Sequence, residues 1–277
     1  MNAIAPPLPE YPSPKDSTVS QRIALCIEYD GHRFHGWQRQ DNASSVQEHL
    51  EVSLARIEGK PVVCVAAGRT DAGVHAEAML VHANVQQQRF ERAPRAYIHG
   101  VNAHLPTGIV VLSVDAVAAD FHARFHCTER QYRYQIWNRK TCSALHPWRH
   151  WWMPRPLNIS AMQQAATYFV GKHDFNAVRA SGCQAHSSVR TLHRLDVNEH
   201  GYGIHLHVRA DAFLYHMVRN IAGCLVEVGL GRWDAEHITH ILQQKTRQHA
   251  AVTAPAHGLY FTNACYPNFT SRELIEP

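Results

Sequence analysis

The sequence from Val62 to Ala76 reads VVCVAAGRTDAGVHA. Its first part is apolar and rich in β-branched residues, which indicates a buried strand, and it runs into a loop where two glycines enclose Arg69 and Asp71. Glycine allows a tight turn and lets a ligand approach the main chain, so a rigid loop would display both charged side chains. A plain turn with an exposed ion pair explains these residues equally well.

Length and composition indicate a globular protein. At 277 residues the chain is long for one hydrophobic core and favours two domains. Apolar residues make up 45% and charged residues 18% of the chain, and no apolar run is long enough to span a membrane. The N-terminus lacks a basic start followed by an apolar stretch, so we expect a cytoplasmic protein without a membrane partner.

The basic residues favour a nucleic-acid partner. The net charge is only +4, but 22 of the 27 basic residues are arginines. Guanidinium groups bind phosphates in a bidentate way and stack on bases. A genome that favours arginine codons would produce the same bias, and the sequence alone gives both causes equal weight.

The cysteines and histidines do not predict a metal site. Seven cysteines are scattered without a Cys-x-x-Cys pair, which is typical of reduced thiols in a core. The pairs His122/His126 and His146/His150 have the i, i+4 spacing of helical ligands, but neither has a third ligand at a convincing distance. We therefore expect no metal ion.

The first half has the element order of a ferredoxin-like domain. Residues 1–21 form a proline-rich tail without apolar periodicity, which predicts disorder. Within a domain over 22–118, periodicity and capping residues predict a strand over 22–29, a helix over 45–58, a strand from 62, a strand over 79–86, a helix over 94–104 and a strand over 109–117. Such a unit leaves one sheet face open, and RNA-recognition modules bind nucleic acid on that face.

Residues 119–277 repeat this mixed pattern as a second domain. Alternation between 130 and 136 places Tyr132 and Tyr134 on one strand face and Arg133 on the other. This suits base stacking and phosphate contact, and it suits cross-strand aromatic packing equally well. The other predicted elements are a helix near 162–169, a polar loop over 177–186, a hairpin of strands 189–197 and 203–208, a helix over 213–229, a short helix capped by Asp234 and a strand at 258–261.

These patterns predict an α+β fold. Two ferredoxin-like or RRM-like halves would form a mixed, largely antiparallel sheet, with helices on one side and an RNA-binding cleft on the other. The mostly apolar helix over 213–229 carries Arg219. A buried arginine needs an anionic partner, whereas a surface arginine extends its charge into water, and both remain open here.

Seven motifs, in order along the chain, resemble those of the tRNA pseudouridine synthase A family. They are Tyr29-Asp30-Gly31, the run from His35 to Gln40, the run from Gly68 to His75, Asn102 with Leu105-Pro106, the run from Phe121 to Phe125, Tyr132-Arg133-Tyr134, and the run from His216 to Asn220. The resemblance covers about residues 22 to 265. Met79-Leu80 departs from a glutamine-containing stretch of the family, and the proline-rich tail is additional.

The resemblance implies an isomerase. Such an enzyme converts uridine to pseudouridine in the anticodon stem-loop of tRNA, at positions 38 to 40, without a metal or organic cofactor and as a homodimer. Asp71 matches the family's catalytic aspartate, which acts either as nucleophile at the anomeric carbon or as base at the neighbouring carbon. Tyr132 matches the tyrosine that stacks on the target base and assists proton removal. Arg219 would pair with Asp71.

The motifs also supply substrate-binding candidates. Arg69 is expected to fill the space that a uridine leaves when it turns out of the stack. The remaining candidates are Arg39, His75, Arg124, Arg133, His216 and Asn220. Two other functions stay open: a non-catalytic RNA-binding protein would not need the aspartate, and a base-removing glycosidase usually needs a second carboxylate, which the loop around Asp71 lacks.

Overall fold

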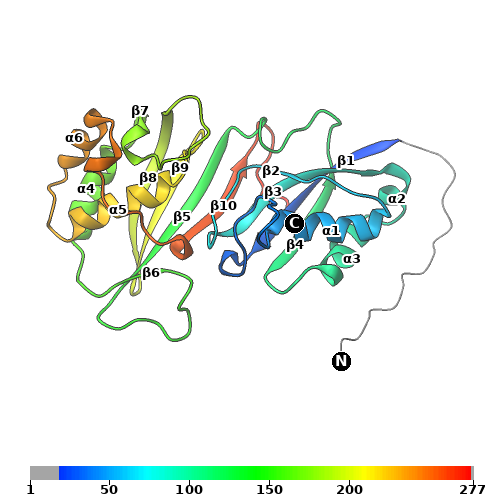
Figure 1. The fold of residues 1–277 in the computed structure, drawn as a ribbon, viewed down its shortest axis with the longest axis horizontal. Helices are drawn as coiled ribbons and strands as arrows, with labels where there is room; N and C mark the ends of the chain where they lie inside the picture. Colours follow the sequence, from blue (N-terminus) through cyan, green and yellow to red (C-terminus); the bar gives the residue numbers. More distant parts are fainter. Residues whose placement is uncertain (1–18, 276–277) are drawn as a thin grey trace.

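The computed structural model describes residues 19–275, which form one open sheet with helices packed on it (Figure 1). The tail predicted for residues 1–21 lies outside the described residues except for its last three, of which Ser20 and Gln21 begin the first strand. No helix in the described part of the chain is long and apolar enough to cross a membrane.

The first half is a ferredoxin-like unit, as predicted. Its elements are β1 (Ser20–Tyr29), α1 (Val46–Glu58), β2 (Val65–Ala66), β3 (His75–Gln86), α2 (Gln87–Arg92), α3 (Ala96–His104) and β4 (Ile109–Ala116). The strands lie in the order β4-β1-β3, with β2 paired to β3, and all of these pairings are antiparallel. Helix α1 begins where predicted because the Ser45 side chain accepts a hydrogen bond from the backbone N–H of Glu48.

The second half has the same arrangement with additional short elements. Its elements are β5 (Glu129–Asn138), β6 (Trp151–Met153), α4 (Ile159–Thr167), β7 (Gly171–Asp174), β8 (Val189–His200), β9 (Gly203–Ala210), α5 (Met217–Gly229), α6 (His237–Gln244) and β10 (Leu259–Cys265). The strand order is β10-β5-β9-β8-β7. The predicted hairpin is confirmed as β8 and β9, which pair from Leu192 to His200.

Strand β10 joins the two halves into one sheet. It pairs in parallel with β3, where Tyr260 lies beside His75, and antiparallel with β5, where Phe261 lies beside Tyr132. The late apolar strand therefore sits in the middle of the sheet, between the halves (Figure 1). This places the loop before β3 two strands away from Tyr132.

Several predicted boundaries are wrong. The strand expected from Val62 begins only at Val65, as β2. The residues before it are not part of the strand: the backbone N–H of Cys64 donates to the Glu51 side chain, and Val63 is exposed. Strand β3 begins at His75, four residues before its predicted start. Helix α5 begins at Met217 instead of residue 213.

The helix predicted to be capped by Asp234 begins later than expected. Its N-cap residue is Glu236, and the backbone carbonyl of Asp234 accepts a bond from the N–H of His237 in the preceding turn. Helix boundaries commonly differ from sequence patterns by one or two residues, because the first turn has few intrahelical hydrogen bonds.

Candidate active site

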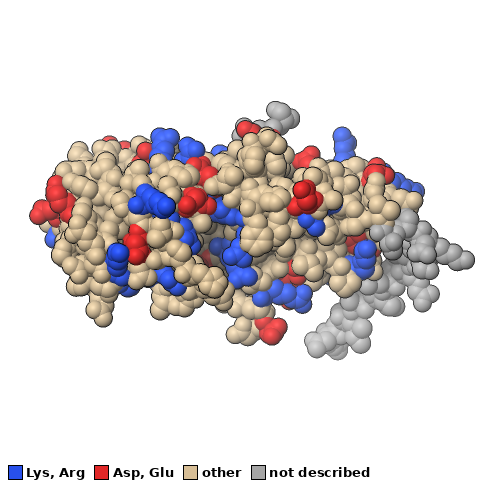
Figure 2. Space-filling model, turned by 90° about the horizontal axis from the view of Figure 1, so that it is seen from above, with Lys and Arg blue, Asp and Glu red and all other residues tan. Residues whose placement is uncertain are grey.

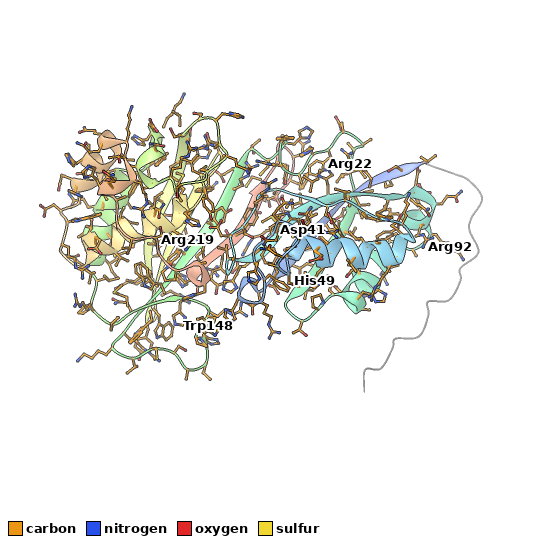
Figure 3. All side chains as sticks on the ribbon, viewed as in Figure 1. Arg22, Asp41, His49, Arg92, Trp148 and Arg219 are labelled. Carbon is orange, nitrogen blue, oxygen red and sulfur yellow. The ribbon has the colours of Figure 1, made fainter. Side chains whose placement is uncertain are left out.

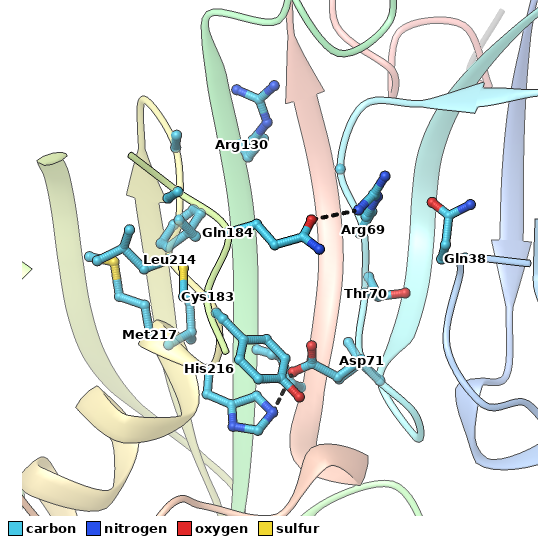
Figure 4. A pocket seen from close by; sticks show the side chains of 18 of the residues that line it. Gln38, Arg69, Thr70, Asp71, Arg130, Cys183, Gln184, Leu214, His216 and Met217 are labelled. Atoms are coloured by element: carbon cyan, nitrogen blue, oxygen red, sulfur yellow. Dashed lines mark hydrogen bonds and ion pairs between the residues drawn. The ribbon is translucent and has the colours of Figure 1, made fainter. Parts of the chain in front are cut away.

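A pocket of about 760 Å³ lies where the two halves meet. Its walls come from the loop before β3, from Tyr132 on β5, from the loop around Gln184 and from the segment that leads into α5. In Figure 4 Arg69 and Asp71 lie on one side, and His216 and Gln184 lie on the other. Segments far apart in the sequence thus build one site.

The pocket lies beside a helix. Met217 and Val218, at the start of α5, line it together with Tyr132. The pocket therefore lies on the side of β5 to which Tyr132 points, next to the segment that leads into α5.

The loop that carries Asp71 is held by hydrogen bonds from two other segments. The backbone N–H of Trp37 donates to the carbonyl of Thr70 at 3.1 Å, and the Tyr29 hydroxyl lies 2.7 Å from the Thr70 hydroxyl. Gly36 has a φ of +89°, and a Cβ atom there would lie 2.6 Å from the Thr70 carbonyl oxygen. Since neighbours fix this backbone on several sides, Asp71 has a defined position.

Asp71 contacts a guanidinium group and an imidazole from the other half of the chain. Its Oδ2 atom lies 3.3 Å from Nη1 of Arg219 and 3.4 Å from Nε2 of His216. Arg219 is itself held, because its Nε–H donates to the Ala254 carbonyl at 2.8 Å. Both the aspartate and the arginine are largely buried, so their attraction is weakly screened by water.

His216 has an unusual backbone. Its φ of 59° is in the left-handed region, which residues other than glycine seldom adopt, and such strain tends to occur at functional sites. Burial lowers the pKa of His216, and the nearby guanidinium of Arg219 lowers it further against the opposing charge of Asp71. The imidazole is therefore mainly neutral near pH 7, and as the Nε2–H tautomer it can donate to the carboxylate.

Tyr132 is buried, and its ring is fixed by two phenylalanines. Its ring centre lies 4.9 Å from that of Phe213 and 5.2 Å from that of Phe261, both in edge-to-face geometry. Burial raises the pKa of the Tyr132 hydroxyl, and the negative charge of Asp71 raises it further. The pocket therefore contains a neutral phenol beside a carboxylate.

Some predicted binding residues line the pocket. Arg69, Arg124 and His216 all do so, and Arg69 contacts the Gln184 side chain at 3.5 Å. Arg39 lies outside the lining residues; it is more than half exposed and pairs with Glu51 at 3.5 Å.

Other predicted binding residues are not among those that line the pocket. Asn220 is fully buried, and its side chain donates to the Val178 carbonyl. His75 is also buried, with its Nδ1 atom 3.1 Å from the Gly31 N–H. Arg133 is on the opposite face of β5 from Tyr132 and pairs with Glu77. These three side chains bond to other protein groups and do not line the pocket.

Several pocket residues were not predicted as site residues, although the motif from His35 to Gln40 contains three of them. They are His35, Gln38, Gln40, Arg130, Phe213 and Gln184. Gln184 lies in an aperiodic polar loop, which offers no signal. Arg130 could have been found, because strand alternation places it on the same face as Tyr132.

The histidines at 122 and 126 bind protein groups. His122 Nδ1 accepts from the backbone N–H of Arg124 and of Phe125, and His126 Nδ1 accepts from the N–H of His122. Between residues 19 and 275 no group of three or more His, Cys, Asp or Glu side chains is arranged to hold a metal ion.

Comparison with known proteins shows the family of this chain. The family model described as tRNA pseudouridine synthase matches residues 25–126 and 165–267. Proteins named tRNA pseudouridine synthase A are 46% identical in Pseudoalteromonas atlantica, over 89% of this chain and 92% of that protein, and 44% identical in Neisseria gonorrhoeae, over 91% and 94%. The one from Rhodospirillum centenum is 46% identical over 89% of this chain and its own full length. The chain therefore belongs to the tRNA pseudouridine synthase family.

Proposed function

We propose that the pocket around Asp71 is where this protein, as an isomerase, converts uridine in tRNA to pseudouridine. The observation that carries the proposal is the arrangement of three groups. A carboxylate contacts Arg219 at 3.3 Å and His216 at 3.4 Å, and it opens into a pocket that also contains Tyr132. Pseudouridine formation breaks the bond from ribose to a ring nitrogen and re-forms it to a ring carbon, which requires a group that acts on the sugar.

Asp71 can act on the sugar in two ways. As a nucleophile its oxygen attacks the anomeric carbon while the uracil leaves, and the turned uracil then displaces it through C5. As a base it instead removes a proton from the neighbouring carbon while the uracil leaves, which forms a double bond in the sugar, and the proton returns to that carbon when C5 of the uracil bonds to the anomeric carbon. Arg219 keeps the carboxylate oriented in either route, because it is fixed to the Ala254 carbonyl as well as to Asp71.

Tyr132 suits the step in which the uracil turns over. Its ring is held by Phe213 and Phe261, so it can stack on the detached base without moving. The raised pKa of its hydroxyl keeps the phenol protonated, which avoids placing a second negative charge beside Asp71. After the new bond has formed, the C5 proton must leave to a group near this ring.

We extend the proposal to the substrate and its conformation. A recessed carboxylate reaches the sugar of a paired uridine only when the nucleotide turns out of its stack, and Arg69 and Arg124 lie where they can contact the RNA around it. Lys and Arg side chains surround a hollow near the middle of the molecule (Figure 2), which suits a polyanion. The anticodon stem-loop as target, a homodimer and a cytoplasmic location complete the proposal, by analogy with the family.

The test is release of tritium from tRNA whose uridines are labelled at C5. The wild-type protein should release tritium because the C5 proton is lost during isomerisation. Asp71→Asn keeps the size of the side chain but removes its charge, so release should stop while tRNA affinity stays within a few fold. Asp234→Asn changes an exposed carboxylate outside the pocket and should behave like wild type.

The same assay separates the other functions. A non-catalytic RNA-binding protein would release no tritium, and a glycosidase would yield free uracil. Near-normal tritium release by Asp71→Asn would show that another group acts on the sugar.

A further inference from the structure

The Arg130 guanidinium group donates four hydrogen bonds, all to backbone carbonyls. Its Nε–H donates to Ala67 at 3.1 Å, its Nη1 to Cys127 at 3.1 Å and to Asp211 at 2.8 Å, and its Nη2 to Arg124 at 2.6 Å. Arg130 also lines the pocket. The N–H donors of Arg130 therefore bond to the protein's own backbone.

The four carbonyls lie in or next to three segments that line the pocket. Ala67 directly precedes the loop of Asp71, and Asp211 directly precedes the segment 212–218 that includes His216. Arg124 and Cys127 lie in the segment that connects the two halves of the sheet. Ala67 and Asp211 are 63 and 81 positions from Arg130, so this one side chain links segments that are distant in the sequence.

We propose that Arg130 is a positioning residue for pseudouridine formation, which sets the distance between the Asp71 loop and the His216 segment. This inference rests on the assignment of the pocket as the active site. A guanidinium group is planar and has five N–H donors in a fixed fork, so it can bond to carbonyls on several sides at once. A lysine has one nitrogen at the end of a flexible chain and cannot reach all four.

The expected consequence is a loss of rate with little loss of binding. Displacing a catalytic group by about 1 Å can reduce a rate by about 100-fold. We therefore expect Arg130→Lys and Arg130→Gln to lower kcat for pseudouridine formation by about 10- to 100-fold. The KM and the Kd for tRNA should change by less than about three-fold, because Arg69 and the other basic side chains around the pocket remain.

Arg22 provides a matched control. Its Nη1 donates to the carbonyl of Phe121 at 2.8 Å, in the same connecting segment, and its Nε donates to Asn84 at 2.9 Å, but it does not line the pocket. Figure 3 shows Arg22 and Arg219 in different halves of the molecule. Arg22→Lys removes a comparable arginine–carbonyl bond and should keep kcat within about two-fold of wild type.

The experiment measures kcat, KM, tRNA Kd and melting temperature for Arg130→Lys, Arg130→Gln, Arg22→Lys and Asp71→Asn. Three results would overturn the proposal. The first is a normal kcat in both Arg130 variants, and the second is a loss of tRNA affinity with a normal kcat. The third is an Arg130→Lys variant that does not fold, which would show that Arg130 stabilises the whole fold and does not specifically position the site. If Asp71→Asn is inactive and the Arg130 variants are normal, only the role of Arg130 fails. If Asp71→Asn is active, the site itself is misassigned.

Discussion

Nη1 of Arg219 lies 3.3 Å from Oδ2 of Asp71, although the two residues are 148 positions apart in the chain. One residue is on α5 of the second half, and the other is in the loop before β3 of the first half. They meet because β10 pairs with both β3 and β5 and so fixes the two halves in one sheet. This contact resolves the two alternatives that the sequence left for Arg219.

Replacing Arg219 with alanine should reduce both stability and activity. The substitution leaves the largely buried carboxylate of Asp71 without its cationic partner and leaves the Ala254 carbonyl without its donor. With Asp71→Ala already present, the loss of Arg219 should cost less, with a coupling of about 0.5 to 3 kcal/mol in a double-mutant cycle measured by urea unfolding. Additive losses would show that the two side chains do not interact energetically.

The Arg232–Glu227 pair, at the end of α5 and beyond it, is the control for this cycle. Its atoms are closer, at 2.8 Å, but the arginine is half exposed, so water and salt screen the pair. Arg232→Ala should change the unfolding free energy by less than about 1 kcal/mol and should leave tritium release unchanged.

Gly36→Ala should damage the catalytic loop. The new Cβ would lie 2.6 Å from the Thr70 carbonyl oxygen, so the loop that carries Asp71 would have to move. Gly59→Ala is a matched change, because Gly59 also has a positive φ of 72° but has no atom within 4 Å of the new Cβ. Gly59→Ala should cost about 1 kcal/mol with normal activity, whereas Gly36→Ala should cost more and lower kcat at least about 10-fold. Equal effects of the two changes would contradict this view of the loop.

Substitutions at His216 should separate backbone strain from chemistry. Glycine accepts a φ of 59° at no steric cost, whereas alanine does not, so His216→Gly should be more stable than His216→Ala by about 1 kcal/mol. Both variants lose the contact with Asp71 and should be slower in tritium release. Equal melting temperatures for the two variants would mean that the backbone relaxes when the imidazole is removed.

His82 should make the fold sensitive to acid. Burial lowers its pKa from 6.5 to about 4, with a further contribution from the nearby His122, and its Nδ1 atom accepts a hydrogen bond from the Ala123 N–H at 3.1 Å. When the pH falls below 6.5, the unfolded chain takes up a proton that folded His82 does not. The stabilisation is therefore complete above pH 6.5 and is lost progressively as the pH falls towards 4.

The measurement for His82 is the urea midpoint at several pH values between about 7.5 and 4.5, the range in which the proton uptake occurs. His82→Gln keeps an acceptor and does not titrate, so its midpoint should fall less steeply than that of wild type. Parallel pH profiles of the two proteins would show that other groups determine the acid sensitivity.

Much of the local structure could be predicted from the sequence, because it depends on short-range patterns. Helix α1 follows from the Ser45 cap and apolar periodicity, and the alternation around Tyr132 gave the buried face of β5. The start of α5 was missed because Phe213 and Leu214 continue the apolar pattern, while the left-handed backbone of His216 interrupts the helix. Such a backbone is stabilised by its surroundings and leaves no signal in the pattern.

The sequence by itself determined the order of the longer elements, the ferredoxin-like character of the two halves and the glycine-bounded loop that presents Asp71. Only the tertiary structure decided which distant groups meet there. Strand β10 pairs with strands of both halves, and Arg130 donates hydrogen bonds to four backbone carbonyls. The Asn220 side chain is buried and donates to the Val178 carbonyl. The physical reason is that these contacts depend on sheet register and on backbone groups, which every residue carries, and not on the spacing of side-chain types along the chain.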